Sequence, residues 1–205
     1  HDVVAFTRSG AERRGASWRD LDVFDLGALG AVVASVDVIV SAYHPGNSAQ
    51  DIGDALQRAI ADPAAYARVA TNLVKALEDR AATRAIVVGG AANLEIAPGV
   101  TTDDDDDRLR QVFRSIGVPE GYAKAAKGHR DALNVLRVSN RRWSYVSPSA
   151  EVYAGERTGR FRIGGDQLLI DGTGRSHISY EDFAFAILDE IEEPRHVQRR
   201  FTVGY

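Results

Sequence analysis

The stretch VDVIVSAYHPG, residues 36–46, decides the fold of this chain. Its first half, Val36 to Val40, is rich in β-branched side chains, which is typical of a buried strand in a parallel sheet. Its second half consists of small and turn-forming residues, from Ser41 to Gly46. In open parallel sheets, ligands bind at the loops that follow the carboxyl ends of the strands. The stretch therefore predicts a parallel sheet with a binding loop directly after this strand.

Further strands and helices are expected on both sides of this stretch. The expected strands are Val3–Thr7, Leu21–Phe24, Ala85–Val88, Trp143–Val146 and Phe201–Val203, with a small β pair at Phe161–Ile163 and Leu168–Ile170 followed by a turn at 171–174. The expected helices are Leu26–Val33, a helix from Asp62-Pro63 to Leu77, Gly121–Val138, and a helix through Leu188 capped by Ser179 and Asp182. The alternation of strands and helices predicts an α/β fold with a doubly wound parallel sheet, as a single domain over residues 1–205.

The amino-acid composition is that of a globular domain and excludes several classes of site and partner. Hydrophobic residues make up 44% of the chain and charged residues 26%, and the formal net charge is −4. This balance is ordinary for a globular domain and offers no concentrated basic face for nucleic acid. Cysteine is absent, which excludes disulfides, thiolate metal ligands and thiol nucleophiles and fits a reducing compartment. We expect a cytoplasmic protein with no membrane segment and no nucleic-acid partner.

An acidic run, Asp103 to Asp107, precedes a helical pattern. Adjacent carboxylates could gather a hard cation, but they lack the spaced ligands of a loop site. We therefore interpret the run as a solvated segment favoured by the amino end of a helix, and predict no metal site there.

Four stretches carry a resemblance to a known family: WSYVSPS at 143–149, GGDQLLI at 164–170, SYEDFA at 179–184 and FTVGY at 201–205. The chain resembles the small, atypical short-chain dehydrogenases known as NADH-flavin reductase-like proteins, relatives of the NmrA-like and biliverdin-reductase-B-like proteins. The resemblance implies an NAD(P)-binding Rossmann fold. Residues 1–8 resemble that family's second strand, and methionine is absent throughout. We therefore expect that the family's first strand, glycine-rich loop and helix are missing from this sequence.

The resemblance also implies which residues hold the cofactor. Arg8 matches the basic residue that meets the adenosine 2′-phosphate, assisted by Arg13 and Arg14, so NADP is favoured over NAD. Asp22 and Val23 match the pair that contacts adenine. The alternatives are a solvated arginine and a helix-capping aspartate. The remaining cofactor-binding candidates lie after later strands: Ser41, Ala42, Tyr43, Gly89, Gly90, Ser147, Pro148 and Ser149.

The catalytic residues are less clear from the sequence. Gly89 and Gly90 stand where typical short-chain dehydrogenases place a catalytic serine. Tyr122 and Lys127 are similar to the Tyr-x-x-x-Lys pair of that superfamily, but their spacing of five does not put them on one helical face. His44 is a conceivable proton donor, although a lone loop histidine is more often structural.

Three functional hypotheses remain open. The first is a reductase that passes a hydride from NADPH to a small-molecule acceptor such as a flavin or quinone. The second is a non-catalytic NAD(P)-binding sensor of the NmrA-like type, and the third is an inactive fragment of such a reductase. The sequence leaves the oligomeric state open.

Overall fold

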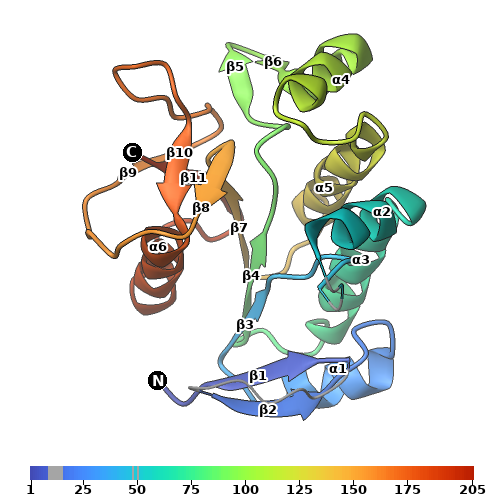
Figure 1. Cartoon of the computed structure of the whole chain (residues 1–205). Helices are drawn as coiled ribbons and strands as arrows, with labels where there is room; N and C mark the ends of the chain where they lie inside the picture. Colours follow the sequence, from blue (N-terminus) through green and yellow to red (C-terminus); the bar gives the residue numbers. More distant parts are fainter. Residues whose placement is uncertain (9–15, 48, 50) are drawn as a thin grey trace.

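The centre of the molecule is a five-stranded sheet in the order β3–β4–β7–β11–β9 (Figure 1). The computed structural model describes residues 1–8, 16–47, 49 and 51–205. The strands are β3 (Val38–Ser41), β4 (Arg84–Val88), β7 (Trp143–Pro148), β11 (Arg199–Gly204) and β9 (Arg162–Gly164). The first four run parallel, and β9 is antiparallel to β11. The predicted α/β fold with a mainly parallel sheet is therefore confirmed.

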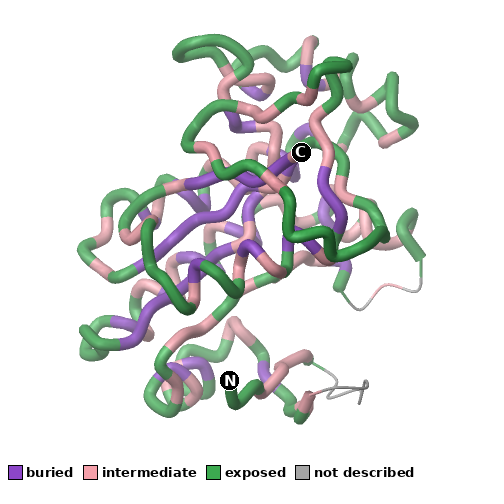
Figure 2. The backbone as a smooth tube through the Cα atoms, turned by 90° about the vertical axis from the view of Figure 1, so that its left-hand side faces the viewer, coloured by how far each residue is buried: buried purple, intermediate pink, exposed green. Residues whose placement is uncertain are grey.

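Helices cover both faces of this sheet. The helices α2 (Ile52–Ala61), α3 (Ala65–Ala76) and α5 (Tyr122–Arg137) lie on one face, and α6 (Tyr180–Glu192) lies on the other. Side chains of β4 alternate between the two faces as strand geometry requires. Ala85 and Val87 pack into the core under α3 and α5, whereas Ile86 packs into the core under α6. The strands between the two layers are the most deeply buried part of the chain (Figure 2).

Two expected helix starts are confirmed. The helix α1 has the expected bounds Leu26–Val33, and Ser179 caps α6 as expected by accepting a hydrogen bond from the Asp182 amide. Asp25, which was not predicted as a cap, caps α1 by accepting a hydrogen bond from the Ala28 amide. The helix expected at residues 121–138 is one residue shorter at each end.

The first two strands form a small sheet of their own. The strand β1 (Val4–Thr7) pairs in parallel with β2 (Ser17–Asp20), not with any strand of the central sheet. The expected strand at Leu21–Phe24 is wrong, because the pairing partner of β1 lies four residues earlier. Leu21 is buried, but residues 21–24 form the turn that leads into α1. Within the described residues β1 and β3 do not pair, as expected for strands that are not direct neighbours.

The helix expected to begin at Asp62-Pro63 begins later. Asp62 ends α2, and α3 begins at Ala65. The Asp62 carboxylate pairs with Arg68 one turn into α3, at 2.5 Å. The helix α2 itself was not predicted from the sequence.

The small elements lie at the carboxyl ends of the central strands. They are β5 (Glu95–Ala97), β6 (Val100–Thr101), a 3-10 turn η1 (Thr102–Asp104), α4 (Asp106–Ser115), β8 (Glu151–Tyr153) and β10 (His177–Ser179). The β pair expected between residues 161–163 and 168–170 is wrong. Residues 162–164 pair instead with β11, and the Leu168 amide donates to the Glu95 carbonyl.

Candidate functional site

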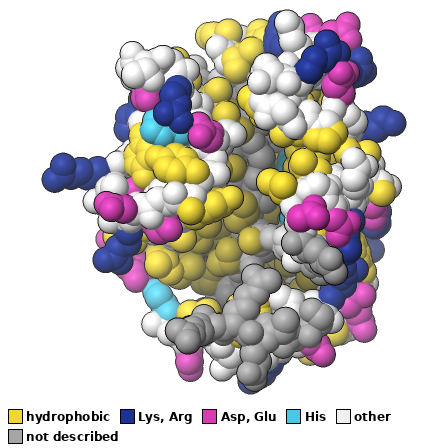
Figure 3. Space-filling view, viewed as in Figure 1, with side chains coloured by type: hydrophobic (Ala, Val, Ile, Leu, Met, Phe, Trp, Pro, Cys, Tyr) yellow, Lys and Arg dark blue, Asp and Glu magenta, His cyan; other side chains and the backbone are white. Residues whose placement is uncertain are grey.

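A hollow lies between the two halves of the molecule at the carboxyl ends of the parallel strands (Figure 3). Helices α2, α3 and α5 stand on one side, and the β8–β10 pair stands on the other. Hydrophobic side chains line much of the hollow. Because β3, β4 and β7 run parallel, the loops that follow them meet at this edge.

The loop after β3 is built around Tyr43 and His44. The Asn47 side chain donates to the Ala42 carbonyl at 3.0 Å, and the Gly46 amide donates to His44 Nδ1 at 3.0 Å. Gly46 packs directly against the backbone of Ala55 in α2, so a side chain there would collide with that helix. The glycine is therefore required for packing, and the loop is held in one conformation by its own hydrogen bonds.

The loop after β4 contains two glycines that leave room for side chains from neighbouring elements. Gly89 lies against the ring of Tyr145 on β7, and Gly90 lies against His129 on α5. Tyr145 donates its hydroxyl hydrogen bond to the His129 carbonyl at 2.8 Å. The absence of a serine at this position thus has a steric reason, because any side chain at Gly89 would displace Tyr145.

An aromatic cluster joins these loops. Tyr66 of α3 lies 4.0 Å from His129, 6.1 Å from Tyr43 and 6.0 Å from His44, measured between ring centroids, and Phe24 lies 5.8 Å from Tyr43. A cavity of about 10 Å³, room for about one water, is lined by Tyr43, Tyr66, His129 and Tyr145. The Tyr66 hydroxyl is buried and lies beside the hydroxyl of Tyr122.

The titratable members of this cluster are uncharged near neutral pH. Burial, together with the nearby His44, lowers the pKa of His129 to about 3. Burial also lowers the pKa of His44, and it raises the pKa of Tyr66 and Tyr43. The cluster is therefore apolar in character and poorly suited to supplying a proton. His44, expected as a candidate proton donor, is held as a neutral hydrogen-bond acceptor.

Arg8 and Asp22 lie beside this cluster, after β1 and β2. The charges of both residues act on the Tyr43 hydroxyl, so the three side chains share one region. Arg8 is exposed, whereas Asp22 accepts a hydrogen bond from the Phe24 amide at 2.9 Å. Val23 packs against the core, and its carbonyl accepts from Asn72. Arg13 and Arg14 lie outside the described residues.

The loop after β7 holds the three candidates Ser147, Pro148 and Ser149. The Ser149 hydroxyl donates a hydrogen bond to the Val203 carbonyl at 2.9 Å and so links the end of β7 to β11. The Ser147 hydroxyl is buried and has no hydrogen-bond partner in the described part of the chain. A nicotinamide dinucleotide needs three kinds of contact, for its amide, its rings and its phosphate. The Ser147 hydroxyl, the aromatic side chains and the cationic Arg8 are of these three kinds. The individual cofactor-binding roles stay predictions.

Tyr122 and Lys127 do not form a pair. Tyr122 contacts Phe113 with ring centroids 5.4 Å apart, and burial raises its pKa. Lys127 instead forms an ion pair with Asp106 of α4. Lys127 thus helps to hold α4 against α5, whereas Tyr122 lies between Phe113 and the hydroxyl of Tyr66.

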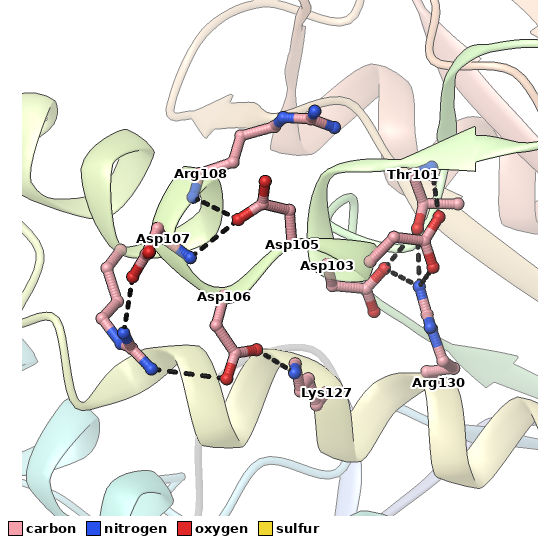
Figure 4. Close-up of polar contacts among 10 residues, drawn as sticks. Thr101, Asp103, Asp105, Asp106, Asp107, Arg108, Lys127 and Arg130 are labelled. Carbon is pink, nitrogen blue, oxygen red and sulfur yellow. Dashed lines mark hydrogen bonds and ion pairs between the residues drawn. The ribbon is translucent and has the colours of Figure 1, made fainter.

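The acidic run fixes α4 in place (Figure 4). Asp105 caps the helix by accepting from the amides of Asp107 and Arg108. Asp103 is fully buried and pairs with Arg130 of α5, which also pairs with Asp104 at 2.8 Å. The interpretation of the run as solvated is therefore wrong for Asp103, because a long-range arginine compensates its burial. In the described ranges no three acidic, histidine or cysteine side chains are grouped as metal ligands.

Sequence reasoning missed Tyr66, His129 and Tyr145. Tyr66 and Tyr145 belong to the hydrophobic core, and His129 lies beside them at the edge of the small cavity. The sequence signal that could have identified these three residues is a polar aromatic side chain at a position where a core helix or strand usually carries an aliphatic one. Across the described residues no helix is long and apolar enough to cross a membrane.

Comparisons with known proteins agree with this architecture. A protein of Bacillus subtilis (strain 168), the uncharacterized protein YwnB, is 29% identical over 207 residues, which is 99% of this chain and 86% of that protein. A crystal structure from Burkholderia pseudomallei, called a "putative exported protein", is 35% identical with a TM-score of 0.77 and covers 100% of this chain and 88% of its own. A structure from Streptococcus pneumoniae TIGR4, called a "putative NADH-flavin reductase", is 26% identical with a TM-score of 0.78 and covers 100% and 87%.

A protein-family model described as NAD(P)H-binding matches residues 1–194, nearly the whole chain. The matched region contains the loops after β3, β4 and β7 that form the hollow. This chain belongs to the NAD(P)H-binding family.

Proposed function

We propose that this protein is a reductase that uses NADPH to reduce a flat, conjugated acceptor such as a flavin or a quinone. One observation carries the proposal: the aromatic cluster around Tyr66 stands at the same sheet edge as Ser41, Gly89 and Ser147. The resemblance to the Streptococcus pneumoniae structure, whose name includes an NADH-flavin reductase, supports it.

The preference for NADPH rests on Arg8. A guanidinium can form paired, charge-assisted hydrogen bonds to a phosphate, and only NADPH carries the 2′-phosphate. NADPH supplies a hydride, while the protein binds and orients the two rings. Asp22 and Val23 are proposed to hold the adenine end, and Ser147 to Ser149 the nicotinamide end.

The choice of acceptor follows from the side chains around the hollow. Tyr43 is partly exposed and its ring packs against buried Tyr66, and the two histidines beside them are neutral near pH 7. Tyr122 and Lys127 do not form the pair that ordinary alcohol oxidation needs, because Lys127 forms an ion pair with Asp106. A flavin or quinone fits such a site, because the acceptor is a flat ring and needs no Tyr–Lys pair.

A cofactor-oxidation assay tests the proposal. NADPH consumption should be measured with a flavin and with a quinone as acceptor, for the wild type, Tyr43→Ala and Tyr180→Ala. Tyr180 is exposed and lies on α6, so it is the matched control. We expect acceptor-dependent oxidation that Tyr43→Ala lowers at least about tenfold, the loss of about 1.4 kcal/mol of ring contact. No oxidation with either acceptor would contradict the proposal.

A second candidate is a non-catalytic dinucleotide sensor, favoured because Lys127 pairs with Asp106 and not with Tyr122. A sensor would bind NADP⁺ and NADPH but show no turnover with any acceptor. Calorimetric titration with both nucleotides, carried out beside the oxidation assay, distinguishes the two functions.

A further inference from the structure

A second cluster of titratable groups lies on the opposite side of the hollow, in the β8–β10 pair. His177 of β10 places its Nε2 atom 3.0 Å from Asp171 Oδ2 and its Nδ1 atom 3.4 Å from the Tyr153 hydroxyl of β8. The rings of Tyr153 and His177 are stacked, with centroids 6.0 Å apart and an angle of 22° between planes. The three side chains thus form a chain of hydrogen bonds from a carboxylate through an imidazole to a phenol.

The carboxylate end of this chain is fixed. Asp171 Oδ1 accepts hydrogen bonds from the Thr173 amide, the Thr173 hydroxyl and the Arg175 amide at 2.7 to 3.0 Å. These bonds hold the pKa of Asp171 well below its usual range and leave Oδ2 for His177. An ionised, immobile acceptor at Nε2 keeps a proton on that nitrogen and turns Nδ1 toward Tyr153.

The backbone places this chain next to the candidate nicotinamide loop. β8 begins at Glu151, two residues after Ser149. The His177 carbonyl accepts from the Tyr205 amide at 3.1 Å, and Gly204 lies against both the Ser149 hydroxyl and the His177 carbonyl. Tyr153 is 36% exposed, whereas the side chains of His177 and Asp171 are largely covered. The phenol is thus the member of the chain that a bound molecule can reach.

Other charged groups surround the imidazole. Arg175 pairs with Glu151 at 2.7 Å, and both flank the chain, while the Tyr205 ring lies 5.1 Å from His177. The other histidine–carboxylate pair, His196 with Glu190, is different. Glu190 is buried and also holds Arg84 and Ser144, at the amino ends of the central strands. That pair is part of the core, whereas the Tyr153 hydroxyl opens to solvent.

We propose that Asp171, His177 and Tyr153 form a relay that delivers the proton required when the acceptor is reduced. This inference rests on the proposed reductase function. Each turnover transfers a hydride, two electrons and one hydrogen, from NADPH to the acceptor and leaves NADP⁺. Tyr153 gives its hydroxyl proton to the acceptor oxygen or nitrogen. His177 then takes up a proton from solvent at Nδ1 and passes it to the Tyr153 phenolate, while Asp171 stays ionised and holds Nε2–H.

The roles differ along the relay. Tyr153 is the catalytic residue, because it would touch the acceptor, and His177 and Asp171 are positioning residues. A positioned proton donor contributes about 10²–10⁴-fold to rate. We therefore expect Tyr153→Phe and His177→Ala to lower kcat for quinone reduction about 100-fold at unchanged KM for NADPH, and Asp171→Asn to lower it less.

The test combines turnover, rescue and spectroscopy on the full chain. Added imidazole should restore the turnover of His177→Ala but not that of Tyr153→Phe. If His177 had only a structural role, added imidazole would not restore turnover. Ring-nitrogen NMR should show the Nε2–H tautomer of His177 in the wild type and a mixture in Asp171→Asn. Tyr180→Phe and His1→Ala are the matched controls. Tyr153→Phe keeps the ring stack, so it remains decisive where His177→Ala fails to fold.

The possible failures are distinguishable. Wild-type turnover that Tyr153→Phe retains within about threefold overturns the relay alone, as does a wild-type His177 without the Nε2–H tautomer. Absence of NADPH oxidation by the wild type overturns the reductase function and the relay with it.

Discussion

At the scale of single residues, Arg8 is the side chain proposed to favour NADPH over NADH. We expect Arg8→Ala to weaken NADPH binding by about 1.5–3 kcal/mol, the value of a hydrogen bond to a charged group, and to leave NADH binding nearly unchanged. Titration of the variant and the wild type with both dinucleotides measures the difference. An equal loss for both would remove Arg8 from the 2′-phosphate.

His129 should make stability depend on pH. Its pKa is about 3 in the folded chain against 6.5 for a free histidine, so the unfolded chain binds more protons between these values. Stability from this group is complete above about pH 6.5 and is lost as the pH falls toward 3. We expect urea midpoints of His129→Phe, which keeps a ring against Tyr66, to fall less over this range than those of the wild type. Parallel curves for the two proteins would show that His129 is not the titrating group.

At the scale of elements, the 3-10 turn η1, which leads into α4, is held to α5 by the Arg130–Asp103 pair. Asp103 is fully buried, so Arg130→Ala leaves an uncompensated carboxylate and should cost about 3 kcal/mol of unfolding free energy. Arg110→Ala is the control, because its ion pairs with Asp106 and Asp107 are exposed and should be worth at most about 1 kcal/mol. Chemical denaturation measures both. Equal losses would mean that Asp103 is compensated by other groups.

The elements also show which features a sequence can predict. The end of α5 and the cap of α6 depend on neighbours within one turn, and both were predictable. The strand after β1 was misplaced because a ladder partner 13 residues away selects Ser17–Asp20 over the more apolar Leu21–Phe24. The loops after β3, β4 and β7 were identified as site loops because strand direction alone brings them to one edge. Tyr66, His129 and the Asp171–His177 pair were missed, because each depends on contacts between distant elements.

At the scale of the whole molecule, the two ends of the proposed cofactor site stand on separate sheets. Arg8 and Asp22 follow β1 and β2, whereas Ser41, Gly89 and Ser147 follow the central strands. No backbone ladder joins the two sheets within the described residues, and side chains such as Phe6 make the connection through the core. We expect intact NADPH to raise the melting temperature more than a mixture of 2′-phospho-AMP and reduced nicotinamide mononucleotide at the same concentrations. Equal shifts would show that the two sheets already move as one body.

In the proposed site, the separation of the two sheets would make a bound dinucleotide a link between them as well as a reactant. Once one end of the dinucleotide is bound to one sheet, the binding of its other end to the second sheet is intramolecular. The strength of that second step depends on the effective concentration of the free end near its sheet. The same link would order the sheets that it joins, and part of the contact energy would be consumed in that ordering. The affinity for the dinucleotide and the rigidity of the two sheets would therefore change together.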